Sequence, residues 1–324
     1  MSDTAKRSVI IYNPVKVDVE HLHAKVDAAV AEFGWGPVEW VETTEDEPGE
    51  SQAREAAASG AEMVVACGGD GTVRSVATGL HGSDTALGII PEGTGNLLAR
   101  NLGLPLDFNR AVRAAYAGRD RSIDFCHADV VRTDGSEERI HFAVMAGVGI
   151  DAQMIVNTDD DLKKRFGVLA YAVAISKSLG GGDRIQVRHQ LDDEPPATSK
   201  AHSVIIGNCG ELVGTIQLIP DAEPDDGILD ILVMRPKDLL GWGQIFGSIF
   251  WHMVSKSVAK AVGNTDRRRG MHRNISTLSY QTGKKFTAKL SKPEVFEVDG
   301  DTVGTVTEFS IGLETRALTV RVNS

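Results

Sequence analysis

The sequence has little cysteine. Three residues in a chain of 324 are cysteines, Cys67, Cys126 and Cys209, and no two of them are near one another in the chain. An odd number of widely separated cysteines does not suit a disulfide framework, and it lacks the paired spacing of a zinc site. We therefore expect reduced thiols and a cytoplasmic protein.

Long apolar segments are also missing. No uncharged apolar run reaches the ~18 residues that a helix needs to span a bilayer. The first residues, Met1 to Arg7, carry charges and lead directly into an apolar run, which is not typical of a secretory signal. We therefore expect a chain that does not cross a membrane.

An excess of positive charge is absent as well, because 34 Lys and Arg stand against 45 Asp and Glu, for a net charge of -11. Such a chain is a poor general nucleic-acid binder, so we expect no nucleic-acid partner. One segment, residues 252–292, is nevertheless basic, with ten Lys or Arg and a single acid, Asp266. It follows an aromatic amphipathic stretch, residues 239–254. These segments predict either a helix lying on an anionic membrane or a helix packed in the protein beside a solvated basic face.

Through about the first 120 residues, apolar runs typical of buried strands alternate with segments of helical periodicity. This alternation predicts a parallel sheet covered by helices, that is, an α/β domain. The predicted strands are 8–12, 38–41, 63–67 and 86–90, and the predicted helices are 18–33, 50–59, 73–80 and 97–102.

The pattern changes near Ser122 to short alternating strands separated by turn sequences such as Asp-Gly and Pro-Pro. Many short strands with frequent turns predict an antiparallel sandwich or barrel-like second domain. Two helical stretches, 160–179 and 238–262, interrupt it, and an exposed loop is expected at 192–199. The predicted strands are 128–132, 140–146, 184–190, 201–207, 228–234, 277–280, 286–290 and 295–298.

Four polar turns follow the four predicted parallel strands: Asn13-Pro14, Thr43-Thr44, 68–74 and 91–96. The carboxyl ends of parallel strands form the ligand-binding edge of such a sheet, so we expect these turns to converge. Gly68-Gly69 leaves the backbone free to approach a ligand, and the N–H groups that open the next helix can bind an anion. Judged on the glycines alone, the alternative is that this segment is an ordinary strand-to-helix turn that binds no ligand.

The sequences Gly68-Gly69-Asp70-Gly71-Thr72 and Pro91-Glu92-Gly93-Thr94-Gly95-Asn96 resemble the diacylglycerol kinase catalytic-domain family, which includes bacterial lipid kinases and the sphingosine and ceramide kinases. The resemblance continues in order over nearly the whole chain. It is carried further by Ile123-Asp124, 146–152, 220–230 and Val298-Asp299-Gly300-Asp301.

This resemblance implies an ATP-dependent lipid kinase. It implies an N-terminal three-layer α/β nucleotide-binding domain, like that of NAD kinases and phosphofructokinases, over residues 1–125. A C-terminal antiparallel β-sandwich that binds lipid would span 126–309, with the last strand, about 310–324, returning to the first domain. The likeness also implies ATP and Mg²⁺ as cofactors, a lipid substrate met at a membrane surface by a peripherally associated protein, and a homodimer.

By position in the family motifs, the resemblance assigns nucleotide binding to residues of all four turns. Thr43 is the alternative to Thr44. After Asn13-Pro14 the chain has Val15-Lys16 in place of the glycine-lysine pair that the family often has, so it stays open whether the loop at 13–16 contacts the nucleotide. The assigned residues are Asn13, Pro14, Thr44, Gly68, Gly69, Asp70, Gly71, Thr72, Val73, Arg74, Gly93 and Thr94.

The general base falls on Asp301, a shorter carboxylate than the Glu usual in the family's Asp-Gly-Glu motif. Asp70 is the alternative base, and Asp124 is a third candidate that would orient water or magnesium. Alternatively, Asp301 has no catalytic role and is only a residue of a type I′ hairpin turn, since Asp-Gly between strands is a common turn signal.

The resemblance also implies a structural magnesium held by the side chains of Glu223 and Asp226 and the carbonyl of Ile228, a donor set that suits a hard cation. A simple polar turn is the alternative. Leu97 stands where bacterial members of the family often have Asp. This removes a carboxylate near the expected acceptor site, so the identity of the lipid that accepts the phosphate is open. Diacylglycerol is the family default, and the alternatives are a sphingoid base or other lipid alcohol, an NAD-kinase-like soluble substrate, or a non-catalytic lipid-binding regulator.

Overall fold

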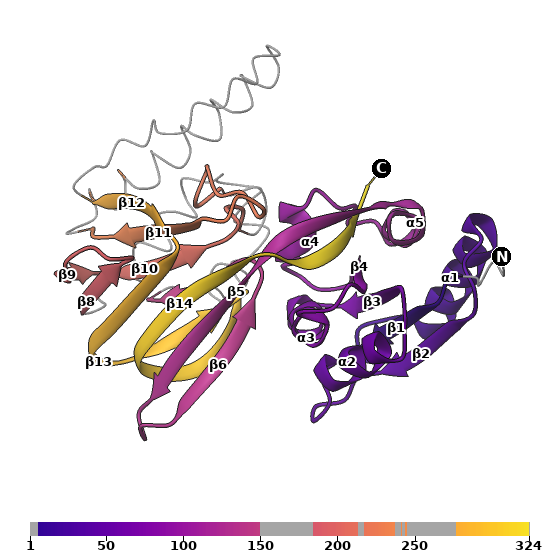
Figure 1. Ribbon diagram of the computed structural model, residues 1–324, viewed down its shortest axis with the longest axis horizontal. Coiled ribbons are helices and arrows are strands. Elements are labelled where there is room, and N and C mark those ends of the chain that lie inside the picture. Colours follow the sequence, from indigo (N-terminus) through magenta and orange to yellow (C-terminus); the bar gives the residue numbers. More distant parts are fainter. Residues whose placement is uncertain are drawn as a thin grey trace, which may run out of the picture.

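The computed structural model describes residues 6–149, 184–212, 217–236, 241, 244 and 277–323. Figure 1 shows an α/β part at one end of the molecule and a β part at the other, with β5 and β14 running side by side between them. No helix within these ranges is long and apolar enough to span a membrane. The helical stretch predicted at 160–179, the stretch predicted at 238–262 apart from 241 and 244, and most of the basic segment lie outside the described residues.

The α/β part contains the predicted parallel sheet, in the order β4-β3-β1-β2. Its strands begin and end within one residue of the sequence expectation because each is a short apolar run bounded by turn residues. They are β1 (Ser8–Tyr12), β2 (Val38–Glu42), β3 (Met63–Gly68) and β4 (Ala86–Pro91).

Helices cover both faces of this sheet, which makes three layers. Alternate residues of β1 point to opposite faces: Ile11 joins the core beneath α2 (Glu50–Ala58) and α3 (Asp70–Leu80), and Ile10 joins the core beneath α1 (Val19–Phe33) and α5 (Phe108–Ala117). The three-layer α/β prediction is confirmed. A further short helix, α4 (Leu97–Asn101), follows β4.

Local capping signals explain why the helix bounds were predictable. The carboxylate of Asp18 accepts the N–H of His21 at 3.1 Å and caps α1, and Gly34 ends that helix with a left-handed φ of 68°. Helix α5 was not predicted, although Asp107 caps it in the same way by accepting the N–H of Arg110 at 3.0 Å.

The second part is the predicted antiparallel β-sandwich, with a core of its own formed by side chains from strands of both layers. β13 joins the layers, since its first half pairs with β8 and its last residues pair with β7. The strands are β5 (Arg119–Arg132), β6 (Glu137–Phe142), β7 (Met145–Val148), β8 (Ile185–Leu191), β9 (Ala197–Ala201), β10 (Ser203–Gly207), β11 (Leu229–Met234), β12 (Leu278–Gly283), β13 (Lys285–Val298) and β14 (Asp301–Val322).

Two expectations for this part were wrong in detail. The exposed loop at 192–199 contains the start of β9, a polar edge strand without a strong apolar pattern. The two strands expected at 286–290 and 295–298 form the single strand β13, which shifts register between Lys289 and Glu294. A bulge of this kind interrupts the period-2 pattern, so one bent strand resembles two.

Two long strands connect the parts. β5 pairs with β14 over nearly its whole length, and position 125 lies inside β5, so the domain bounds 1–125 and 126–309 stay a prediction. The last residues of β14 lie against the parallel sheet, where Val320 pairs with Leu87 of β4. The same strand thus begins at the sandwich end and finishes beside the α/β sheet.

Candidate functional site

Backbone hydrogen bonds bring the four polar turns to one edge of the parallel sheet. Asn13 donates its N–H to the carbonyl of Cys67 at 3.1 Å, and Thr43 donates to Tyr12 at 2.9 Å. Glu92 donates to the carbonyl of Gly68 at 2.8 Å. Each turn is therefore tied to its neighbour where the strands end, as the sequence analysis expected.

The two glycine turns touch through their backbones. A Cβ atom added to Gly93 would lie 2.7 Å from the Cα of Gly69, and one added to Gly68 would lie 2.7 Å from the Oγ1 of Thr72. Side chains at Gly68 and Gly93 would therefore push apart the strand end, the start of α3 and the 91–96 turn. Their absence keeps the N-terminus of α3 close to both turns.

Asp70 joins the two turns. Its carboxylate oxygens accept the N–H groups of Asn96 at 2.9 Å and Leu97 at 2.6 Å, so it caps α4 from the start of α3. Burial raises the pKa of the Asp70 carboxyl, and the nearby Asp301 adds to this, whereas the two N–H groups oppose it. A carboxylate with a raised pKa binds a proton more readily than an ordinary Asp.

Asn96 was not among the predicted site residues. It adopts a left-handed conformation with a φ of 50°, and its amide both accepts from the N–H of Gly93 at 2.9 Å and donates to the Gly93 carbonyl at 2.8 Å. Asn tolerates this conformation better than most residues, so the signal was present in the Gly-Thr-Gly-Asn turn.

Asp301 lies over the start of α3. It is the first residue of β14, and its Oδ2 is 3.2 Å from where a Cβ of Gly71 would be. The hairpin turn suggested by the Asp-Gly signal is present: its left-handed central residues are Asp299 and Gly300, with φ values of 49° and 87°, and Asp301 closes it by pairing with Val298. Asp301 follows them, with 46% of its side chain exposed. The structure thus brings Asp301 and Asp70, two of the three predicted catalytic residues, to the same helix N-terminus.

Arg74 and Val73 form hydrogen bonds within the protein. The guanidinium of Arg74 pairs with Asp301 at 3.0 Å and donates to the carbonyl of Val298 at 2.7 Å. The N–H of Val73 is bound by the carbonyl of Gly69 at 3.0 Å, inside α3. The phosphate-binding role that the resemblance implies for these two residues stays a prediction.

Lys16 belongs to the loop after β1, whose contribution to the site the sequence did not determine. Its Nζ lies 3.2 Å from where a Cβ of Gly69 would be, so the ammonium group sits directly over the glycine turn. Its side chain is exposed, and within the described ranges it forms no ion pair. Thr44 and Thr94 are also exposed at this edge, whereas Thr43 is buried. Lys16 and Thr94 are therefore accessible polar groups at the glycine turns, and Thr44 is accessible elsewhere on the same edge of the sheet.

Comparison with protein families identifies both parts of the chain. Residues 7–128 match the diacylglycerol kinase catalytic domain, and residues 143–251 match the YegS C-terminal NAD kinase beta sandwich-like domain. A protein named probable lipid kinase YegS-like from Cronobacter sakazakii is 30% identical over 214 residues, which cover 63% of this chain and 67% of that protein. The chain belongs to the diacylglycerol kinase catalytic-domain family.

Other curated relatives match over shorter shares of their own length. A Klebsiella pneumoniae protein, also named probable lipid kinase YegS-like, is 32% identical over 55% of this chain and 58% of its own. The Synechocystis protein sll0036 is 28% identical over 76% of this chain and 52% of its own. The chain thus spans about half to two thirds of these relatives.

The fold is also that of solved members. The crystal structure of a diacylglycerol kinase from Bacillus anthracis superimposes with a TM-score of 0.68 at 19% identity, covering 99% of this chain and 98% of that one. At this identity the likeness shows the fold and not the substrate.

Asp124, the third predicted catalytic residue of the family motif, is fully buried and bound by backbone groups. Its carboxylate oxygens accept the N–H groups of Gly227 at 2.6 Å and Arg316 at 2.8 Å. It therefore joins the 224–228 turn to the irregular segment of β14 around Arg316. Its predicted role in orienting water or magnesium stays a prediction.

The predicted structural magnesium turn is shaped by its own hydrogen bonds. Asp226 accepts the N–H of Ile228 at 3.0 Å, and Asp225 pairs with Arg121 at 2.8 Å. In the part of the chain that the structure describes, no group of three or more His, Cys, Asp or Glu side chains is arranged to hold a metal ion. The assignment of magnesium to Glu223, Asp226 and Ile228 stays a prediction.

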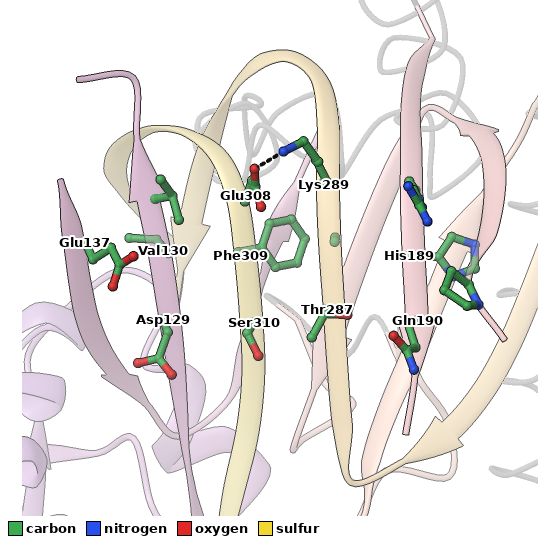
Figure 2. A pocket seen from close by; sticks show the side chains of 14 residues that line it. Asp129, Val130, Glu137, His189, Gln190, Thr287, Lys289, Glu308, Phe309 and Ser310 are labelled. Atoms are coloured by element: carbon green, nitrogen blue, oxygen red, sulfur yellow. Dashed lines mark hydrogen bonds and ion pairs between the residues drawn. The ribbon is translucent and has the colours of Figure 1, made fainter. Parts of the chain in front are cut away.

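The structure also has two hollows in the β part. The larger, about 470 Å³, lies on the polar face of β5, β14, β13 and β8, where Figure 2 shows Lys289 paired with Glu308. The smaller, about 30 Å³, is mostly apolar and adjoins the turn that carries Asp301. Its lining residues are Met145, Ala146, Gly147, Ile205, Leu212, Glu297 and Gly300.

If Lys16 contacts the triphosphate, Lys16→Met should raise the KM for ATP about tenfold, because a hydrogen bond to a charged group contributes about 1.5–3 kcal/mol. Lys25→Met, on the exposed side of α1, is the matched control and should change little. Initial-rate kinetics at varied ATP concentration measure both. An unchanged KM in Lys16→Met would remove Lys16 from the site.

If the two glycine turns form the nucleotide site, Gly93→Ala should weaken ATP binding about 10- to 100-fold. The new Cβ meets the backbone of Gly69, which cannot move aside cheaply, and overpacking of this kind costs about 1–3 kcal/mol. Thr94→Ala removes only an exposed hydroxyl next to it and should cost less than tenfold. Calorimetric titration with ATP compares the two variants, and equal affinities would contradict the expectation.

Proposed function

We propose that this member of the lipid kinase family transfers the γ-phosphate of ATP to the hydroxyl of a lipid alcohol, with diacylglycerol as the first acceptor to test. The observation that carries the proposal is the presence of Asp70 and Asp301 at the N-terminus of α3, where the two glycine turns meet. Lys16 adds a positive charge at the same place.

Phosphoryl transfer to an alcohol forms a bond between the acceptor oxygen and Pγ while the bond from Pγ to the leaving oxygen of ADP breaks. The acceptor hydroxyl must lose its proton. In this proposal Asp301 accepts that proton, because it is the more exposed carboxylate and faces the start of α3. The N–H groups at the helix start and Lys16 would bind the phosphate oxygens.

Asp70 fits a magnesium ion carried by the nucleotide, because each of its oxygens accepts one N–H and keeps a second lone pair. When bound, Mg²⁺ would neutralise charge on the phosphates. Asp70 remains the alternative base, since burial raises its pKa.

Two features support a lipid acceptor over a soluble one. The small apolar hollow adjoins Gly300, one residue from Asp301, and Leu97 packs within 3.4 Å of where a Cβ of Gly300 would be. Apolar surface beside the reacting carboxylate suits a hydroxyl borne by a hydrophobic molecule. Cytoplasmic location, peripheral association with an anionic membrane, and a homodimer are parts of the same proposal.

The test is transfer of labelled γ-phosphate from ATP, with Mg²⁺, to lipids in mixed micelles. The panel contains diacylglycerol, monoacylglycerol, ceramide and sphingosine, with NAD as the soluble control. We expect label in diacylglycerol and none in NAD. Label in a different lipid would change the acceptor, label in NAD would replace the lipid kinase with a soluble-substrate kinase, and no label with ATP bound would favour a non-catalytic regulator.

A further inference from the structure

The turn that delivers Asp301 is held from two sides. It comprises residues 298–301, where β13 and β14 pair through Val298 and Asp301 around the two left-handed residues Asp299 and Gly300. On the side of the β part, Asp299 accepts three N–H groups from 143–145 and donates its own N–H to Met145 at 2.8 Å. On the side of the α/β part, the contact comes from Arg74.

Arg74 holds both the backbone and the side chain of this turn. Its Nη1 donates to the carbonyl of Val298, at one end of the turn, and its Nη2 pairs with the carboxylate of Asp301, at the other end. The Arg74 side chain is 17% exposed, so water competes little for these contacts. A planar guanidinium can bind two acceptors in a fixed geometry, which a lysine ammonium cannot do.

The position of Arg74 links this contact to the nucleotide site. Arg74 lies one helical turn after Asp70 on α3, whose first turn faces the glycine loop. A short Asp carboxylate reaches less far than Glu, so its approach to the helix start depends on how closely the turn is held. A displacement of about 1 Å can cost about a hundredfold in rate.

We propose that Arg74 is a positioning residue, which fixes the 298–301 turn on α3 so that Asp301 reaches the acceptor hydroxyl at the phosphate site. This inference rests on the proposed function, and it differs from the phosphate-binding role that the family resemblance implies for Arg74. The two roles predict different kinetics, because a phosphate ligand governs ATP binding and a positioning residue governs turnover.

The variants Arg74→Gln and Arg74→Lys test it. With the lipid that the wild-type protein phosphorylates, Arg74→Gln should lower kcat about 10- to 100-fold, with the dissociation constant for ATP changed less than twofold. Arg74→Lys should fall between Arg74→Gln and wild type, since an ammonium can serve only one end of the turn well. A loss of ATP affinity with kcat retained at saturating ATP would overturn the proposal.

Arg132→Gln is the matched control. Arg132 also donates to a carbonyl of β14, that of Val303, and pairs with a carboxylate, Glu138, but these partners all lie in the β part. It should leave kcat unchanged. An equal loss in Arg132→Gln would mean that any weakening of β14 slows the reaction, and would overturn the specific role of Arg74.

A second readout does not depend on activity. Hydrogen exchange of the amides at 297–302, measured on the full-length chain without substrate, should become faster in Arg74→Gln and stay unchanged in Arg132→Gln. If the wild-type protein phosphorylates no substrate, the proposed function fails while this measurement still decides whether Arg74 holds the turn. Unchanged exchange in Arg74→Gln would overturn the proposal.

Discussion

Asp301→Asn is expected to lower kcat about 10²- to 10⁴-fold, the usual contribution of a general base. Its affinity for ATP should change little. The amide keeps the size of the side chain and can still accept a hydrogen bond from Arg74, but it cannot take the proton of the acceptor hydroxyl. Phosphate transfer to lipid and calorimetric binding of ATP measure the two quantities separately.

Asp129→Asn is the matched control for this variant. The Asp129 side chain is 46% exposed and paired with Arg139, just as that of Asp301 is 46% exposed and paired with Arg74. Asp129 lies on β5 and Arg139 on β6, however, both in the β part. It should leave kcat unchanged. Asp70→Asn should also reduce turnover, because it removes one of the two oxygens that cap α4. Full activity in Asp301→Asn together with its loss in Asp70→Asn would move the base to Asp70.

The α/β part could be predicted almost completely from the sequence, because its signals are local. A parallel strand buried on both faces is a continuous apolar run, and capping residues such as Asp18 and Gly34 mark where a helix begins and ends. The β part was harder. Its long strand β14, 22 residues from Asp301 to Val322, was expected only from about residue 310 onwards, and only from the family resemblance. Its sequence gives no clear strand pattern, because a left-handed residue at Arg316 and register shifts interrupt the alternation.

The parts of the site that depend only on the course of the backbone or on a sequence motif were predictable. The convergence of the four turns follows from parallel strand order, and Asp70 and Asp301 came from motifs. The contacts of Arg74 and Lys16 could not be predicted, because they depend on partners that are distant or on a loop that departs from the family pattern. Arg74 meets Val298 across 224 positions of the chain, and no periodicity connects such a pair.

Asp299→Ala is expected to cost about 4 kcal/mol of unfolding free energy. The Asp299 carboxylate is buried and accepts the N–H groups of Ala143, Val144 and Met145 at 2.9–3.0 Å, and each N–H left unsatisfied costs about 1–3 kcal/mol. The left-handed φ of 49° adds strain of about 1–2 kcal/mol for Ala. Urea unfolding of wild type and variant gives the difference.

Asp192→Ala is the comparison that separates the cost of losing buried hydrogen bonds from the cost of backbone strain in the turn. Asp192 has nearly the same left-handed φ, 47°, and accepts the N–H groups of Lys284 and Lys285 at 2.8 Å, but it is exposed, so water can replace those bonds. We expect a cost of about 1–2 kcal/mol there, mostly backbone strain. Asp299→Gly removes the carboxylate without the strain and should still cost about 3 kcal/mol. Equal losses in Asp299→Ala and Asp192→Ala would show that turn strain alone explains both.

The variant Asp299→Asn connects this stability effect to the site. The single amide oxygen of Asn can still accept some of the hydrogen bonds from the N–H groups of 143–145, and Asn tolerates a left-handed φ. The protein should therefore remain folded. The turn is then held mainly by Arg74, and Asp301 is less well fixed over α3. A fall in kcat with unchanged ATP affinity, under conditions where the variant is fully folded, would mean that the Asp299 contact, like the Arg74 contact, serves the position of Asp301. Retained kcat would confine Asp299 to stability.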